Sequence, residues 1–230
     1  MEKSTKNDKQ MKILNLYACL GGNRYKWNEV KNDIEVTAVE LDPECAKLYQ
    51  ERFPNDNVII ADAHQYLLNH YKEFDFIWSS PPCPSHSVTN NFLNAQGVVR
   101  FPDMKLYEEI ILLKHFYKGK FCIENVISYY EPLIIPNKRG RHYYWTNFNL
   151  PNILSTRKAP SMEARGKGVD REDKVENWIK FHDYNFRNYK GKQAVNKMAR
   201  NLVDYEAGKT IFETMLGIVK KQNIKQTELF

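Results

Sequence analysis

The chain has 230 residues, 42% of them hydrophobic and 27% charged, with a formal net charge of +6. This is the composition of a globular protein that can bury its own core without disulfides. No apolar run approaches the roughly 20 residues of a membrane span, and residues 1–10 are too polar for a signal peptide. We therefore expect a flexible leader over 1–10 and no membrane association.

The first 150 residues alternate strand-like and helix-like segments. Short apolar runs predict strands at 12–17, 35–40, 58–61, 74–79, 121–125 and 142–146. Asp42-Pro43 predicts the start of a helix that Pro54 ends, and apolar residues three to four apart predict another after Pro102. A last helix is expected over about 205–220, returning to the sheet. This alternation predicts an α/β fold with a doubly wound, mostly parallel sheet.

Polar residues follow the predicted strands where ligands bind in such sheets, beyond the carboxyl ends. The glycines of Ala18-Cys19-Leu20-Gly21-Gly22 follow the first strand and would let a ligand approach the backbone. Glu40, about 20 positions on, could hold ribose hydroxyls. Asp62 could accept a hydrogen bond from an adenine amino group. The alternatives are an ordinary turn for the glycines and a helix cap for Asp62.

Cys83 lies between prolines in Ser80-Pro81-Pro82-Cys83-Pro84, directly after a predicted strand. A rigid loop with polar neighbours suits a nucleophilic thiol, although a lone cysteine is more often structural. Glu124 ends a hydrophobic strand, where partial desolvation can keep a carboxyl group protonated and able to donate to a ring nitrogen. The alternative for Glu124 is a cap or a salt bridge.

Arg139 and Arg141 alternate along Lys138-Arg139-Gly140-Arg141. Alternate residues of an extended chain point the same way, so the two guanidinium groups could together hold a phosphate and a base carbonyl. A solvated strand edge is the other interpretation.

Residues 155–200 contain twelve Lys/Arg and six Asp/Glu, which accounts for the whole net charge. Five aromatic residues are interleaved with these charges: Trp178, Phe181, Tyr184, Phe186 and Tyr189. The mixture suits a phosphate backbone with bases to stack against. A basic surface over a small aromatic core explains it equally well.

In order and spacing these motifs resemble the cytosine-C5 DNA methyltransferases, over Lys12 to about Phe148. The glycine turn resembles the cofactor loop of that family, Pro82-Cys83 its Pro-Cys motif, Glu124-Asn125-Val126 its Glu-Asn-Val, and residues 137–141 its Gln-x-Arg-x-Arg. Four departures stand out: Cys19 replaces a glycine, Pro84 and Asn137 each replace a glutamine, and the last helix lacks the usual Gly-Asn-Ser start.

The resemblance implies a Rossmann-like, S-adenosylmethionine-dependent enzyme that methylates C5 of cytosine in double-stranded DNA, with the target base flipped out of the helix. Cys83 would add to C6, Glu124 would hydrogen-bond N3 and the exocyclic amine, and Asn125 would fix the Cys83 loop. Arg141 would contact the base carbonyl, and Arg139 the Cys83 loop or a phosphate. Substrate contacts are expected at Ser85, His86 and Ser87. The expected cofactor contacts are Tyr17, Ala18, Cys19, Leu20, Gly21, Gly22, Glu40, Leu41, Asp62, Ala63 and Pro82.

This interpretation divides the chain into a catalytic domain over 11–148, a short basic target-recognition region over 149–200, and a returning helix over 201–230. It implies a monomeric, cytoplasmic enzyme of bacterial or phage origin, of the kind found in restriction-modification systems. The four cysteines have no zinc-like spacing, so no metal is expected.

Three alternatives remain from the residues. Ser80-Pro81-Pro82 also resembles half of the loop of exocyclic amino methyltransferases, which act on adenine N6 or cytosine N4. The C5 chemistry could be directed at RNA. A nucleic-acid-binding module without catalysis ranks last, because the nucleophile, the acid and the arginines are all present.

Overall fold

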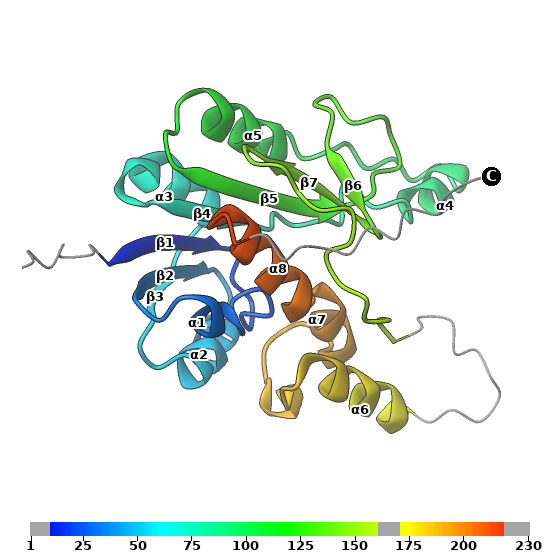
Figure 1. Ribbon diagram of the computed structural model, residues 1–230. Helices are drawn as coiled ribbons and strands as arrows, with labels where there is room; N and C mark the ends of the chain where they lie inside the picture. The colour runs from blue at the N-terminus through cyan, green and yellow to red at the C-terminus, as the bar shows by residue number, and fades with distance from the viewer. Residues whose placement is uncertain (1–9, 161–170, 219–230) are drawn as a thin grey trace, which may run out of the picture.

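The computed structural model describes residues 10–160 and 171–218 of the chain. Over these residues the protein forms a seven-stranded sheet in the order β3-β2-β1-β4-β5-β7-β6 (Figure 1). The parallel strands are β1 (Met11–Leu16), β2 (Ile34–Glu40), β3 (Asn57–Ile60), β4 (Phe76–Ser79) and β5 (Lys120–Val126). Two antiparallel strands, β7 (His142–Thr146) and β6 (Asn137–Arg139), complete the edge.

The predicted α/β class and mostly parallel sheet are therefore confirmed. The predicted strands lie within two residues of the observed ones, and only β6 was missed. Of the expected leader, only Gln10 is described. Residues 219–230 of the predicted C-terminal region also lie outside the described residues.

Three of the described helices, α2, α3 and α8, begin after an aspartate that caps them. Asp42 accepts a hydrogen bond from the Glu44 amide at the start of α2, as predicted, and Asp204 does the same for the Glu206 amide at the start of α8. The described helices are α1 (Trp27–Val30), α2 (Pro43–Arg52), α3 (Ala63–His70), α4 (Asn90–Ala95), α5 (Lys105–His115), α6 (Arg171–His182), α7 (Val195–Asn201) and α8 (Tyr205–Met215).

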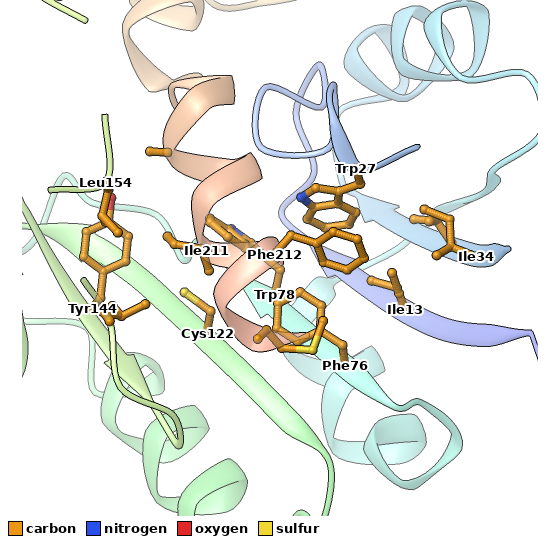
Figure 2. Packing of buried hydrophobic residues seen from close by; sticks show 14 residues of the cluster. Ile13, Trp27, Ile34, Phe76, Trp78, Cys122, Tyr144, Leu154, Ile211 and Phe212 are labelled. Carbon is orange, nitrogen blue, oxygen red and sulfur yellow. The ribbon is translucent and has the colours of Figure 1, made fainter. Parts of the chain in front are cut away.

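Side chains that alternate along the strands build a core on each face of the sheet. On one face Ile13, Phe76 and Trp78 pack against Trp27 of α1 and Phe212 of α8 (Figure 2). The Trp27 and Phe212 rings are stacked, with centroids 5.2 Å apart. On the other face, strand residues pack against α3 and α5. The strands contribute Leu14, Leu16 and Ile77, α3 contributes Leu67, and α5 contributes Leu106 and Ile110.

A third cluster decides between the two interpretations of the basic, aromatic segment. Trp178, Phe186 and Tyr189 are buried, and pack with Leu48 of α2 and Met198 of α7. Phe181 and Tyr184 are half-buried beside Arg157 and Arg52. The aromatic residues of the basic segment thus form a core between the C-terminal helices and α2, rather than a surface for stacking bases.

The strand order reverses between β1 and β4, where β2 lies on one side and β5 on the other. Such a switch point separates the connections that follow neighbouring strands and leaves a crevice at their carboxyl ends. Leu16 at the end of β1 is in register with Ser79 at the end of β4. The fold therefore brings the glycine turn next to the Cys83 loop.

Candidate active site

The loop after β1 turns sharply through three left-handed residues. Tyr17, Cys19 and Gly21 have φ of 54°, 46° and 69°. Cys19 therefore has a backbone conformation that favours glycine, which is the residue usual at this position in the cytosine-C5 DNA methyltransferases that the motifs resemble. Its amide donates to Glu40 Oε2 at 2.8 Å, and the Gly21 amide donates to the Ala18 carbonyl at 2.8 Å.

The two glycines are needed for packing within the protein. A Cβ on Gly21 would lie 2.3 Å from the Phe53 ring, and one on Gly22 would lie 2.4 Å from the Val203 carbonyl oxygen. Both positions thus also have a structural reason to be glycine, because the loop is clamped between α2 and the segment before α8. Leu20 and Ala18 are also buried.

The groups around this loop fit S-adenosylmethionine. Glu40 accepts hydrogen bonds from the amides of Cys19 and Asp42, which leaves acceptor positions on its carboxylate for ribose hydroxyls. Burial raises the pKa of Glu40. Leu41 is 67% exposed beside it and offers an apolar surface for a purine.

Asp62 is the N-cap of α3 and accepts from the Gln65 amide at 3.0 Å. Its other oxygen lies 3.8 Å from Lys105 Nζ. The hydrogen bond from the Gln65 amide lowers the pKa of this carboxyl group, so it stays an ionised acceptor. Ala63 follows it as the first residue of the helix and is buried.

The Cys83 loop is tethered at several points. Asn125 Nδ2 donates to the Pro81 carbonyl at 3.1 Å, as an anchor of the loop should. The Cys83 carbonyl accepts from the amides of His86 and Ser87, both at 3.0 Å. Pro82 is exposed and Cys83 partly buried. The thiol is therefore held in place at the rim of the sheet.

The Glu124 carboxylate affects the protonation of the Cys83 thiol. Burial raises the pKa of the Cys83 thiol, the Glu124 carboxylate raises it further, and the Lys197 cation opposes both. Glu124 is buried, and His142 Nε2 lies 3.5 Å from its Oε1. Neither His142 nor Lys197 was predicted as a site residue. The signal for His142 was its position directly after Arg141, on a strand that neighbours Glu124.

The three expected substrate residues after Cys83 differ in exposure. Ser85 and Ser87 are half-buried, and their hydroxyls accept from the amides of Asp103 and Thr89. His86 is buried, with its Nδ1 2.6 Å from the Tyr130 hydroxyl. Burial lowers the pKa of His86. In this conformation His86 supports the loop from inside and presents no surface to a substrate.

The two arginines do not lie on one extended strand, which corrects the prediction that they point the same way. β6 ends at Arg139, Gly140 turns with a φ of 56°, and β7 begins at His142. Arg139 donates to the carbonyls of Lys138, Leu150 and Pro151, at 2.9, 3.2 and 2.7 Å. Arg141 is exposed in the turn. Arg139 thus anchors the chain that follows β7, and Arg141 faces solvent.

The fold is the doubly wound α/β fold of methyltransferases. A solved methyltransferase of Entamoeba histolytica, EhMeth, superposes with a TM-score of 0.53 at 12% identity, covering 93% of this chain and 100% of that one. Spodoptera frugiperda DNMT2 matches 50% of this chain and 35% of its own at 25% identity, with a TM-score of 0.36. No curated protein matches the chain.

Residues 11–129 match the family model of C-5 cytosine-specific DNA methylases, and the chain belongs to this family. The match spans the cofactor loop, Glu40, Asp62, Cys83 and Glu124, and ends before the arginines. The chain is therefore a methyltransferase of cytosine C5 that uses S-adenosylmethionine.

Two further findings concern the described residues. No helix among residues 10–160 and 171–218 is long and apolar enough to cross a membrane. In the same part of the chain, no group of three or more His, Cys, Asp and Glu side chains is placed to hold a metal ion.

Proposed function

We propose that the chain is a DNA (cytosine-5-)-methyltransferase that acts on duplex DNA through a covalent adduct of Cys83. The observation that carries this proposal is the pairing of a partly buried thiol and a buried carboxyl group at one sheet rim, beside the cofactor loop. A thiol near a carboxyl that can hold a proton is what activation of cytosine requires.

The reaction begins when the Cys83 thiolate adds to C6 of a flipped-out cytosine, which makes C5 nucleophilic. Glu124 hydrogen-bonds N3 and the exocyclic amine and offsets the negative charge that develops on the ring. S-adenosylmethionine supplies the methyl group as an electrophile to C5. A base, for which we propose a bound water molecule, then takes the C5 proton, the C6–S bond breaks to release Cys83 as a thiolate, and the ring becomes aromatic again. Asn125 holds the loop in place throughout, and Arg141 contacts the base carbonyl.

The family supports DNA as the substrate, and the charge of the C-terminal region supports a nucleic acid. Five exposed lysines there form no ion pair with any described carboxylate: Lys158, Lys180, Lys190, Lys192 and Lys197. Such cations bind phosphate without reading sequence. We infer that residues 149–200 form the target-recognition region, that the enzyme acts as a monomer, and that it belongs with restriction-modification enzymes.

Trapping with 5-fluorocytosine tests the covalent step. A fluorine at C5 cannot leave as a proton does, so the adduct cannot break down after methyl transfer. A duplex with this base should form a denaturant-stable complex with the wild-type chain in the presence of S-adenosylmethionine, and none with Cys83→Ala. A complex of equal yield with Cys83→Ala would contradict the proposal, and trapping on RNA alone would reassign the substrate.

A further inference from the structure

A glutamate on α5 is completely buried, although it belongs to none of the sequence motifs. Glu109 is 0% exposed and lies on the same helix face as Leu106, Ile110 and Leu113. Burying an unpaired carboxylate is costly, so such a group persists when donors surround it. Three donors do so here.

Each donor comes from a different segment at the carboxyl rim of the sheet: the loop after β1, the end of β4 and the first turn of α3. The Tyr17 hydroxyl, at the start of the cofactor loop, donates to Glu109 Oε1 at 2.7 Å. The Ser79 hydroxyl, at the end of β4 and four residues before Cys83, donates to Oε2 at 2.6 Å. His64 Nδ1, two residues after Asp62, lies 3.1 Å from Oε1. One carboxylate thus joins the loop after β1, the end of β4 that leads into the Cys83 loop, and α3 after Asp62.

The arrangement is specific to this carboxylate. The neighbouring Glu108 lies on the other side of His64, 3.1 Å from its Nε2, and its side chain is 56% exposed. Glu108 therefore contacts His64 from the solvent side, whereas Tyr17 and Ser79 donate to Glu109. Hydrogen bonds to a buried charged acceptor are stronger than neutral ones and fix geometry more closely.

We propose that Glu109 is a positioning residue that holds the cofactor loop and the Cys83 loop at a fixed separation. The inference rests on the proposed function of both loops. Methyl transfer is sensitive to displacements of about 1 Å between reacting groups. A shared acceptor beneath both loops would keep the bound cofactor and the thiol in register, because neither loop can shift without breaking a buried hydrogen bond.

The two branches of the network can be separated by removing one oxygen atom at a time. Tyr17→Phe removes the branch to the cofactor loop, and Ser79→Ala the branch to the Cys83 loop. Two measurements on the full chain need no catalysis: the Kd of S-adenosylmethionine by calorimetry, and the rate of Cys83 alkylation by iodoacetamide, followed by mass spectrometry of its peptide. Glu108→Gln is the matched control for Glu109→Gln.

Tyr17→Phe should weaken cofactor binding about fivefold to tenfold, the usual effect of removing one hydrogen bond, with a much smaller change in Cys83 alkylation. Ser79→Ala should speed Cys83 alkylation about threefold or more, because the looser loop exposes the thiol, with a much smaller change in Kd. Glu109→Gln should change both quantities, and Glu108→Gln neither. In turnover, Tyr17→Phe should mainly raise KM for the cofactor and Ser79→Ala mainly lower kcat.

A merely structural role would give a different pattern, in which the branch variants lower the melting temperature and shift both quantities together or neither. That result would overturn the inference, as would wild-type values for Glu109→Gln. If Glu109→Gln does not fold, the single-atom variants carry the test. A wild-type chain that binds cofactor but methylates no DNA would contradict the proposed function, while the split between the branches would still decide the role of Glu109.

Discussion

At the scale of single residues, the site contains a thiol that is not activated in the free protein. Burial and the Glu124 carboxylate both raise the pKa of Cys83, so the thiol is mostly protonated near neutral pH. The nearby Lys197 cation opposes this shift. The proposed mechanism therefore predicts that Cys83 is activated only when the substrate arrives and Glu124 engages the base.

The arginine pair shows how similar residues serve different ends. Arg139→Ala removes three hydrogen bonds to carbonyl groups, so it should lower the free energy of unfolding by about 1–3 kcal/mol. Arg141→Ala should change it by less than about 0.5 kcal/mol, because its side chain is exposed, while lowering turnover on DNA. Urea unfolding of both variants, with methyl transfer measured in parallel, checks this contrast. Equal destabilisation by the two would refute it.

At the scale of elements, the sequence predicted the positions of the strands well. Short apolar runs with β-branched residues form strands here, and Asp42-Pro43 starts α2 as expected. The Gly140 turn was not predicted. Over only five residues, arginines that alternate along one strand cannot be told from arginines on either side of a two-residue hairpin turn. Glu109 was also missed, although its place between Leu106 and Ile110 on a buried stripe was a signal.

The contact between α3 and α5 should make stability depend on pH. The hydrogen bond to Glu109 raises the pKa of His64 above its ordinary 6.5, and Glu108 and Asp62 are the other charges facing it. The folded state then binds the proton more tightly than the unfolded state. The stabilisation that protonated His64 gives the folded state is therefore complete below pH 6.5. It is lost as the pH rises through the pKa of His64 in the folded state.

We expect the free energy of unfolding to fall in this window with a slope of at most about 1.4 kcal/mol per pH unit. His64→Gln should remove that slope. His70→Gln, which breaks an exposed pair with Glu73, is the control and should keep it. Denaturant unfolding at a series of pH values measures both. A slope that survives in His64→Gln would show that another group titrates.

At the scale of the whole molecule, the sequence predicted α8 and its return to the sheet, but it could not place α6 and α7. Composition marks the region as basic and aromatic, but which residues are buried depends on contacts with α2, more than 100 residues away in the chain. Tyr189 donates to Asp42 at 2.6 Å, and Tyr25 to Asp183 at 2.6 Å. These long-range bonds use the aromatic groups internally and leave the lysines outside.

Because the aromatic residues of this region are used inside the protein and its lysines are exposed, we predict that it binds DNA through charge. The double variant Lys190→Ala/Lys192→Ala should reduce the slope of log K against log salt by about 0.9 for each phosphate that the protein no longer neutralises. Lys118→Ala/Lys120→Ala, at the amino end of β5 and the opposite rim, should leave the slope unchanged. Titrations of a labelled duplex at several salt concentrations give both slopes. An equal reduction by the two double variants would show that binding is not confined to the C-terminal region.

The most direct test of the central claim is nucleoside mass spectrometry of duplex DNA incubated with the protein and S-adenosylmethionine. We predict 5-methylcytosine with the wild-type chain and none with Cys83→Ala. Methylation by Cys83→Ala at the wild-type rate, or N4-methylcytosine or N6-methyladenine in place of 5-methylcytosine, would contradict the assignment of Cys83 as the nucleophile.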